Sequence, residues 1–248
     1  MENIKTTLLY KIIKFTIKCF YRKYEIIGLE HLPEGACILV GNHSQIHGPL
    51  VSELYFPQKF YTWCVGDMMH FKDVPKYAFE DFWSQKPKWI QPFYKVLSYI
   101  IAPLSVCIFN NARTIGVYHD NRIMSTFKKT VKLMNNGANI IIFPEHDVKH
   151  NNIIYDFQHN FSDVARVYHK KYNDDVYFVP FYISPKLRKV YIGEYTVFDV
   201  NNDPEAERNR IRGFLMNGIT DIAVNLPLHT VVPYRNIKKN KYPKNRED

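Results

Sequence analysis

Residues 35–42 read GACILVGN, a short apolar run that ends in Gly-Asn. This pattern predicts a buried strand that leads into a polar loop. Three further segments repeat it: LSVCIFN (104–110), NIIIFPE (139–145) and VYFVPFYIS (176–184). Segments with helical spacing lie between or after them, at 121–136, 157–172 and 204–226. Strands that alternate with helices predict an α/β fold, with a central, mostly parallel or mixed sheet flanked by helices.

Composition and charge divide the chain into three parts. Its 248 residues, 46% of them apolar, suit one globular domain, and its four cysteines form no C-x-x-C pair. The net charge is +9, and the two ends supply all of it: residues 1–24 hold six basic and one acidic residue, and residues 235–248 hold six and two. We therefore expect an electrically neutral body, 25–234, a basic N-terminal segment and a basic C-terminal tail, in a reducing compartment.

The N-terminal segment, residues 4–24, has apolar residues at helical spacing and a lysine or arginine every three to four residues. The lysines recur too often for a helix that crosses a bilayer, and no cleavage site of a signal peptide follows. The segment predicts a basic amphipathic helix in a membrane interface, at the cytoplasmic face; the alternative is a helix packed on the body. Residues 86–105, interrupted by three prolines, are either a membrane-facing patch or a core helix with a kinked entry.

Four ordered motif regions, and a further stretch after them, give the chain a family resemblance. The segment 28–50 resembles the first motif region of the glycerolipid acyltransferases, typified by lysophosphatidic acid acyltransferases, in which Asn-His is followed after four residues by Asp. Here Asn42 and His43 match, and Gly48 stands at the Asp position. The stretches RTIGVYHD (113–120), IIIFPEHDV (140–148), FVPFYIS (178–184) and IGEYTVF (192–198) resemble the later regions. The family arginines in the second and third regions are replaced by His119 and Val148.

The resemblance implies a glycerol-phosphate acyltransferase-like fold and direct acyl transfer from acyl-CoA or acyl carrier protein to a glycerolipid-type hydroxyl, with no other cofactor and with membrane lipids as partners. His43 would be the general base, since imidazole titrates near neutral pH. Glu145 and Asp147 would supply the missing carboxylate, with Asp147 as the substitute for the Asp that Gly48 replaces. The expected substrate-binding residues are Asn42, Arg113, His119, His146 and Lys149.

Three other interpretations stay open at this stage. The chain has the motif order of the family but lacks its Asp and arginines, which fits a catalytically inactive lipid-binding homologue. His43, His47, His119, His146 and His150 all lie in or beside the motif loops, a pattern that could bind a divalent metal, although no H-E-x-x-H is present. The basic tail 235–246 could contact nucleic acid, but no recognition motif accompanies it and we expect no such partner.

Overall fold

The computed structural model describes residues 6–57, 59–84, 86–118 and 120–247. The chain divides into two compact units that do not coincide with the three parts expected from charge. The smaller unit combines Met1–Phe20 with Trp63–Lys128, and the larger one combines Tyr21–Thr62 with Lys129–Asp248. The predicted mixed α/β architecture with a mostly parallel sheet is confirmed.

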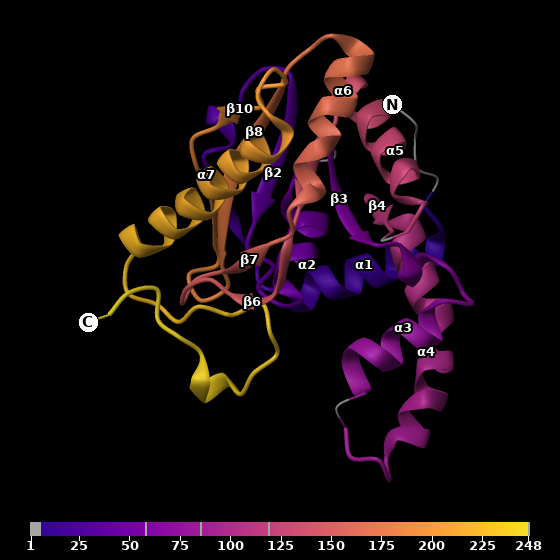
Figure 1. Cartoon of the computed structure of the whole chain (residues 1–248). Helices are drawn as coiled ribbons and strands as arrows, with labels where there is room; N and C mark the ends of the chain where they lie inside the picture. The colour runs from indigo at the N-terminus through magenta and orange to yellow at the C-terminus, as the bar shows by residue number, and fades with distance from the viewer. Residues whose placement is uncertain (1–5, 58, 85, 119, 248) are drawn as a thin grey trace. The chain divides into compact units, whose positions relative to one another are not determined.

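The larger unit is built on this sheet (Figure 1). Its strands follow the order β1-β9-β8-β2-β5-β3, with β10 paired to β8. Their bounds are β1 Glu25–Ile27, β2 Ala36–Gly41, β3 Phe60–Val65, β5 Asn139–Ile142, β8 Val176–Ser184, β9 Lys189–Ile192 and β10 Thr196–Val197. The pairs β2–β5, β2–β8, β3–β5 and β1–β9 are parallel, whereas β8 pairs antiparallel with β9 and β10. A separate antiparallel pair joins β6 (Glu145–Lys149) to β7 (Tyr155–Phe157).

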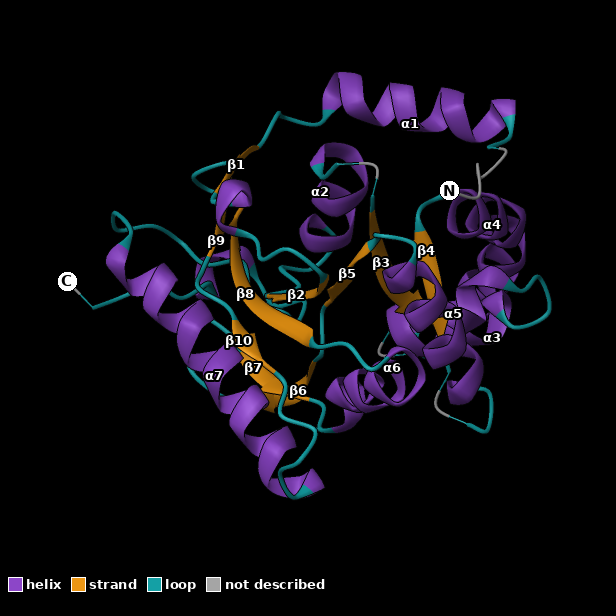
Figure 2. Ribbon diagram, turned by 90° about the horizontal axis from the view of Figure 1, so that it is seen from above, coloured by secondary structure: helices purple, strands orange, loops and turns teal. Residues whose placement is uncertain are grey.

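Side chains of β8 alternate between the two faces of the sheet. Val179, Phe181 and Ile183 pack in one cluster with Leu39 of β2 and Val51 of α2 (His47–Tyr55). The opposite face carries α6 (Val164–Tyr172) and α7 (Pro204–Asn225), as Figure 2 shows. Strands covered on both faces are apolar throughout, which explains the uninterrupted apolar runs in the sequence.

The smaller unit is mainly helical. It contains α1 (Leu8–Phe20), α3 (Val74–Ala78), α4 (Gln91–Asn111), β4 (Thr114–Val117) and the start of α5 (Ile123–Asn135). The short turns Gly66–Met69 and Phe79–Trp83 flank α3. The Ser105 hydroxyl of α4 donates to the Met68 carbonyl at 3.0 Å, and Ala78 and Ala102 are buried between these elements.

The strand predicted at residues 104–110 is wrong, because these residues form the last turns of α4. An apolar run of this length fits a strand or a helix equally well. The helical residues before it decide the outcome, since the helix continues through Pro103 to Asn111. The helix predicted over 157–172 is also shorter than expected, because α6 starts at Val164 after β7 and a short turn.

A buried carboxylate anchors the start of α7. The side chain of Glu207 is fully buried, which alone would raise its pKa. Hydrogen bonds from Arg210, from Asn202 and from the backbone N–H of Asp199 outweigh burial and lower the pKa to about 2. A lowered pKa means that folding favours the charged form, so this network stabilises the protein above the ordinary carboxyl pKa and the stabilisation is lost as the pH falls toward 2.

We expect Glu207→Gln to lower the free energy of unfolding at pH 7 by about 3 kcal/mol, because Arg210 loses its buried partner. The difference from the wild type should shrink at pH 3, where the carboxylate itself begins to protonate. Denaturant unfolding at both pH values measures this. The control is Glu205→Gln, an exposed position in the same helical turn; equal losses in the two variants would contradict the assignment.

Candidate functional site

The predicted base, His43, lies in the loop that leaves the central strand β2. Asn42, one residue earlier, fixes this exit: its Oδ1 accepts from the Ile183 backbone N–H at 2.7 Å, and its Nδ2 donates to the Ile183 carbonyl at 3.0 Å. Nδ2 also donates to the Ser44 hydroxyl at 2.7 Å. The buried Asn42 side chain therefore holds the loop against β8 and is a positioning residue rather than a substrate contact.

The loop itself is strained. Ser44 and Gln45 have φ values of 47° and 55°, so two consecutive side-chain-bearing residues adopt the left-handed conformation. This conformation costs about 1–2 kcal/mol per residue and persists where surrounding contacts enforce it. The chain then closes on itself, since the Gly48 N–H donates to the His43 carbonyl at 2.9 Å as α2 begins.

Glu145, at the start of β6, ties this loop to the β6–β7 pair. Its Oε1 accepts from the His43 backbone N–H at 2.5 Å, and its Oε2 accepts from the Tyr155 backbone N–H at 2.8 Å. Burial raises the pKa of the carboxyl to about 7, although both N–H groups act in the opposite direction. Glu145 therefore positions the backbone of His43, and the side-chain role expected from the sequence becomes a positioning role.

The His43 ring is half-buried between two aromatic rings. Its edge-on neighbours are Phe143, with ring centroids 5.4 Å apart, and Tyr234, at 5.7 Å. Within the described chain, its Nδ1 is a buried atom without a hydrogen-bond partner. Burial lowers the pKa of the ring to about 4, with the Gln45 backbone acting in the opposite direction, so the imidazole is neutral at pH 7.

Gly48 leaves no room for the carboxylate that the family motif has at this position. A Cβ built there would lie 2.5 Å from the His43 carbonyl oxygen and 3.0 Å from Phe143. Real Cβ atoms do not approach a backbone oxygen this closely, so any side chain at position 48 requires the loop to move. The packing of this loop therefore requires glycine at the position where the family motif has Asp.

Asp147 does not take over the missing role in this structure. Its side chain is 74% exposed, and its Oδ1 accepts from Arg235 Nε at 3.0 Å. The expected contact between Asp147 and the His43 ring is absent among the described residues. Residues 145 and 147 would share one face of a regular strand, but the pairing of β6 with β7 shifts register between Glu145 and Lys149, and Asp147 is exposed while Glu145 is buried.

The remaining predicted residues are spread over several places. His146 Nε2 lies 3.6 Å from an Asp156 carboxylate oxygen, and Lys149 donates to the Asn152 side chain at 3.0 Å. Arg113 belongs to the smaller unit, and His119 lies outside the described residues. Among the described residues, no three His, Cys, Asp or Glu side chains come together to hold a metal ion.

Sequence reasoning missed the contribution of the C-terminal strap, our name for residues 227–247. Its Tyr234 contacts the His43 ring, and its Arg235 holds Asp147. Gln45 Nε2 donates to the Arg235 carbonyl at 3.2 Å and to the Tyr242 hydroxyl at 3.1 Å. The tyrosines in an otherwise charged tail were the available signal, since aromatic residues favour packed environments.

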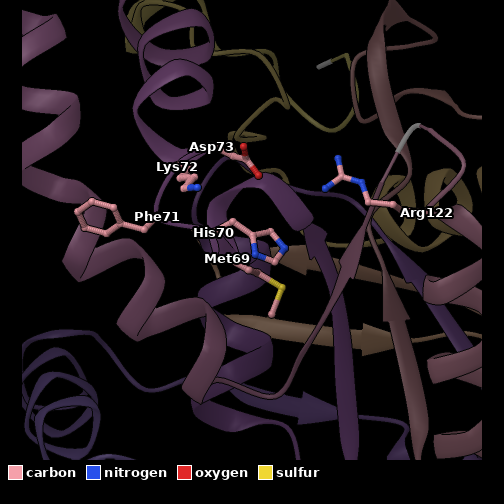
Figure 3. A pocket seen from close by; sticks show the side chains of 6 residues that line it. All are labelled: Met69, His70, Phe71, Lys72, Asp73 and Arg122. Atoms are coloured by element: carbon pink, nitrogen blue, oxygen red, sulfur yellow. The ribbon is translucent and has the colours of Figure 1, made fainter.

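A separate pocket lies in the smaller unit (Figure 3). It has a volume of about 410 Å³ and is lined by Met69, His70, Phe71, Lys72, Asp73 and Arg122. The Arg122 guanidinium and the Asp73 carboxylate point toward each other across it. Arg122 is also bound by Asp120, with Nε at 2.9 and 3.0 Å from the two carboxylate oxygens. Asp67 also lies within ion-pair distance of Arg122. The pocket contains none of the residues predicted for catalysis.

We expect Gly48→Ala to lower the free energy of unfolding by about 1–3 kcal/mol, because the added methyl group overlaps the His43 carbonyl. The matched control is Gly213→Ala in α7, where an added Cβ meets no atom within 4 Å. That change should stabilise the protein by about 0.5–1 kcal/mol, since alanine favours a helix over glycine. Denaturant unfolding of both variants checks the pair, and an unchanged stability of Gly48→Ala would show that the loop has spare room.

No family model matches the chain, and no curated protein matches its sequence. Among solved structures, the crystal structure of the 1-acyl-sn-glycerophosphate (LPA) acyltransferase PlsC from Thermotoga maritima is similar over 86% of this chain and 80% of that one. The two are 16% identical and superpose with a TM-score of 0.43. This likeness is too distant to argue from, so the functional interpretation rests on the residues of the site.

Proposed function

We propose that the protein is a membrane-associated acyltransferase that moves a fatty acyl group from a thioester donor, acyl-CoA or acyl carrier protein, to a hydroxyl of a glycerolipid-type acceptor. One observation carries the proposal: the imidazole of His43 is neutral at pH 7 and follows the central strand β2, and its Nδ1 is buried without a partner among the described residues. Buried polar atoms without partners are rare and often belong to functional sites. The strained Ser44–Gln45 turn beside it supports the same conclusion.

The chemistry needs one base. His43 Nε2 accepts the proton of the acceptor hydroxyl while the oxygen attacks the thioester carbonyl, and the proton of the neutral ring resides on Nδ1. The tetrahedral intermediate expels the thiolate, which takes the proton back from the imidazolium and leaves as a thiol. An ester has then replaced a thioester, and His43 returns to its starting state.

A base with a pKa of about 4 is weak, and no carboxylate contacts the ring among the described residues. In a well-studied serine hydrolase, neutralising the carboxylate that orients the histidine lowers the rate by about 10⁴. We therefore expect slow turnover and dependence on an activated donor, for which a thioester is suited.

The second candidate function is lipid binding without turnover. The packing around Gly48 favours it, since the loop is closed against the side chain that active members of the resembled family carry. Both candidates require contact with lipid, and only the first requires His43 as a base. A variant of His43 therefore separates them.

Exposed side chains on α1 of the smaller unit support the proposal that the protein contacts a membrane. Apolar side chains of α1 are exposed, among them Phe15 at 69% and Phe20 at 87%, and Tyr10 is the buried residue of this helix. Exposed lysines lie on the same helix, and the Thr7 N–H donates to Asn111 Oδ1 at 2.7 Å, which joins its start to the end of α4. The combination of exposed apolar and basic side chains is typical of helices that lie in a membrane interface.

Helix α4 extends the apolar surface of this unit with exposed Phe93, Val96, Tyr99, Ile100 and Leu104. By length and composition alone, α4 is the described helix that is long and apolar enough to cross a membrane, and only 17% of its apolar window is buried. A contiguous exposed apolar surface of this kind marks an interaction site in a protein. We propose that α1 and α4 together bind the lipid surface on its cytoplasmic face.

We expect His43→Ala to abolish acyl transfer in an assay with acyl-CoA and acyl carrier protein donors and a panel of lysolipid acceptors. In the wild type, kcat/KM should stay constant down to about pH 5 and fall as the pH drops through about 4, because the base of the free protein must be neutral. Asp147→Asn is the control and should leave the rate within about twofold, since its side chain is paired with Arg235. Transfer that survives in His43→Ala would refute the mechanism, and no transfer with any donor would favour lipid binding alone.

We expect the double change Phe15→Glu and Phe20→Glu to reduce binding to vesicles that contain anionic lipid by at least about tenfold, because each buried phenyl ring contributes about 1.5–3 kcal/mol. The matched control is Val197→Glu with Leu228→Glu, two exposed apolar positions of the larger unit. Vesicle flotation measures the bound fraction. Equal losses in the two double variants would mean that added charge, and not α1, explains the effect.

A further inference from the structure

The C-terminal strap is folded onto the larger unit at both of its ends. His229 is buried near its start, where its Nε2 accepts from the Tyr182 hydroxyl at 2.9 Å and its Nδ1 donates to the Pro227 carbonyl at 2.7 Å. Asn245 is buried near its end, where its Oδ1 accepts from the His229 N–H at 2.8 Å and its Nδ2 donates to the Ala223 carbonyl at 2.8 Å. The ends of this loop are therefore pinned together.

The stretch between these anchors lies beside the His43 loop. Figure 1 shows the yellow C-terminal segment running back toward β6 and β7. The Tyr234 ring packs against both His43 and Tyr155, at centroid distances of 5.7 Å each. The Tyr242 hydroxyl meets Gln45 at the other end of the stretch. The strap therefore forms one side of the candidate site, with its lysine-rich turn between these two contacts.

That turn carries three exposed cations. Lys238, Lys239 and Lys241 are exposed, and among the described residues none of them forms an ion pair. The charge of Lys239 reaches the site, since it adds to burial in lowering the pKa of His47, at the start of α2. Arg235 differs from these lysines because Asp147 already neutralises it.

The resemblance implies that arginines in the second and third motif regions hold a phosphate, and this chain lacks both of them. Val148 stands at one of these positions, and the neighbouring Lys149 is bound to Asn152. A substrate of the proposed reaction nevertheless carries phosphate groups, either on its acyl carrier or on its acceptor. Exposed ammonium groups on a segment that contacts the His43 loop are the chemistry that binds such anions.

We infer that the C-terminal strap is the phosphate-binding element of the candidate site, and that Lys238, Lys239 and Lys241 bind a phosphomonoester group of the substrate that reaches His43. The inference rests on the proposed acyl transfer for the identity of the substrate. It assigns to the strap the function that arginines in the motif loops would otherwise perform. It also explains why the positive charge of the larger unit is concentrated in a segment that is folded against the His43 loop.

Calorimetric titration of the full chain at low salt tests the inference with two probe pairs. Coenzyme A is compared with 3′-dephospho-coenzyme A for the donor side, and sn-glycerol 3-phosphate with glycerol for the acceptor side. We expect the wild type to bind at least one phosphomonoester more tightly than its matched probe. The triple change Lys238→Ala, Lys239→Ala and Lys241→Ala should weaken that binding by about five- to tenfold or more, and added salt should weaken it in the wild type.

The matched control is the triple change Lys128→Ala, Lys170→Ala and Lys186→Ala, which removes the same charge from exposed positions elsewhere. It should leave binding within about twofold. Equal weakening in both triple variants, or binding of neither phosphomonoester by the wild type, would overturn the inference.

His43→Ala separates the inference from the proposed function, because it should retain phosphate binding while losing transfer. If transfer depends on His43 but the strap variant binds phosphate normally, the function stands and the inference fails. If phosphate binding depends on the strap but transfer does not depend on His43, the strap assignment stands and the mechanism fails.

Discussion

The candidate site depends on one buried carboxylate. Glu145 accepts a hydrogen bond from the backbone of His43 with one oxygen and from the backbone of Tyr155 with the other, so a single side chain joins the loop after β2 to the β6–β7 pair. Because Glu145 lies directly after the strand that neighbours β2, the parallel sheet brings the two loops together at one edge. Together with the hydrogen bonds of Asn42 and Gln45, this link holds the left-handed turn at Ser44 and Gln45 that follows His43.

The sequence was sufficient for those features that depend on local patterns. Apolar runs identified β2, β5 and β8, and helical spacing identified α1, α5 and α7 within a few residues. It failed at residues 104–110, since an apolar run does not reveal whether it continues a helix. It also offered both Glu145 and Asp147 as acids for the ring, whereas a register shift in β6 leaves Glu145 buried and Asp147 exposed, and no local pattern reveals such a shift. The contacts of the strap depend on residues almost two hundred positions away, and no local pattern encodes them.

The glycine at position 48 shows how a departure from a motif can be structural. From the sequence alone, Gly48 means that a carboxylate is missing, and a neighbouring acid is the natural substitute. In the folded chain it is the point where α2 closes on the His43 carbonyl, and the adjacent Phe143 ring fills the remaining space. Phe143 therefore occupies part of the space that a side chain at position 48 would need. As a consequence, Nδ1 of the His43 ring has no acidic partner among the described residues.

The low basicity of His43 and the cationic strap are linked by electrostatics. Burial lowers the pKa of His43 because it penalises the imidazolium, and an orienting carboxylate would offset that penalty in the resembled family. A phosphate held by the strap would bring negative charge to the same site, and a nearby anion favours the charged form of an imidazole. On this proposal, the substrate supplies part of the negative charge that an Asp at position 48 would have placed near His43. Basicity would then rise only when a phosphorylated substrate is bound, and the base would remain weak in the empty site.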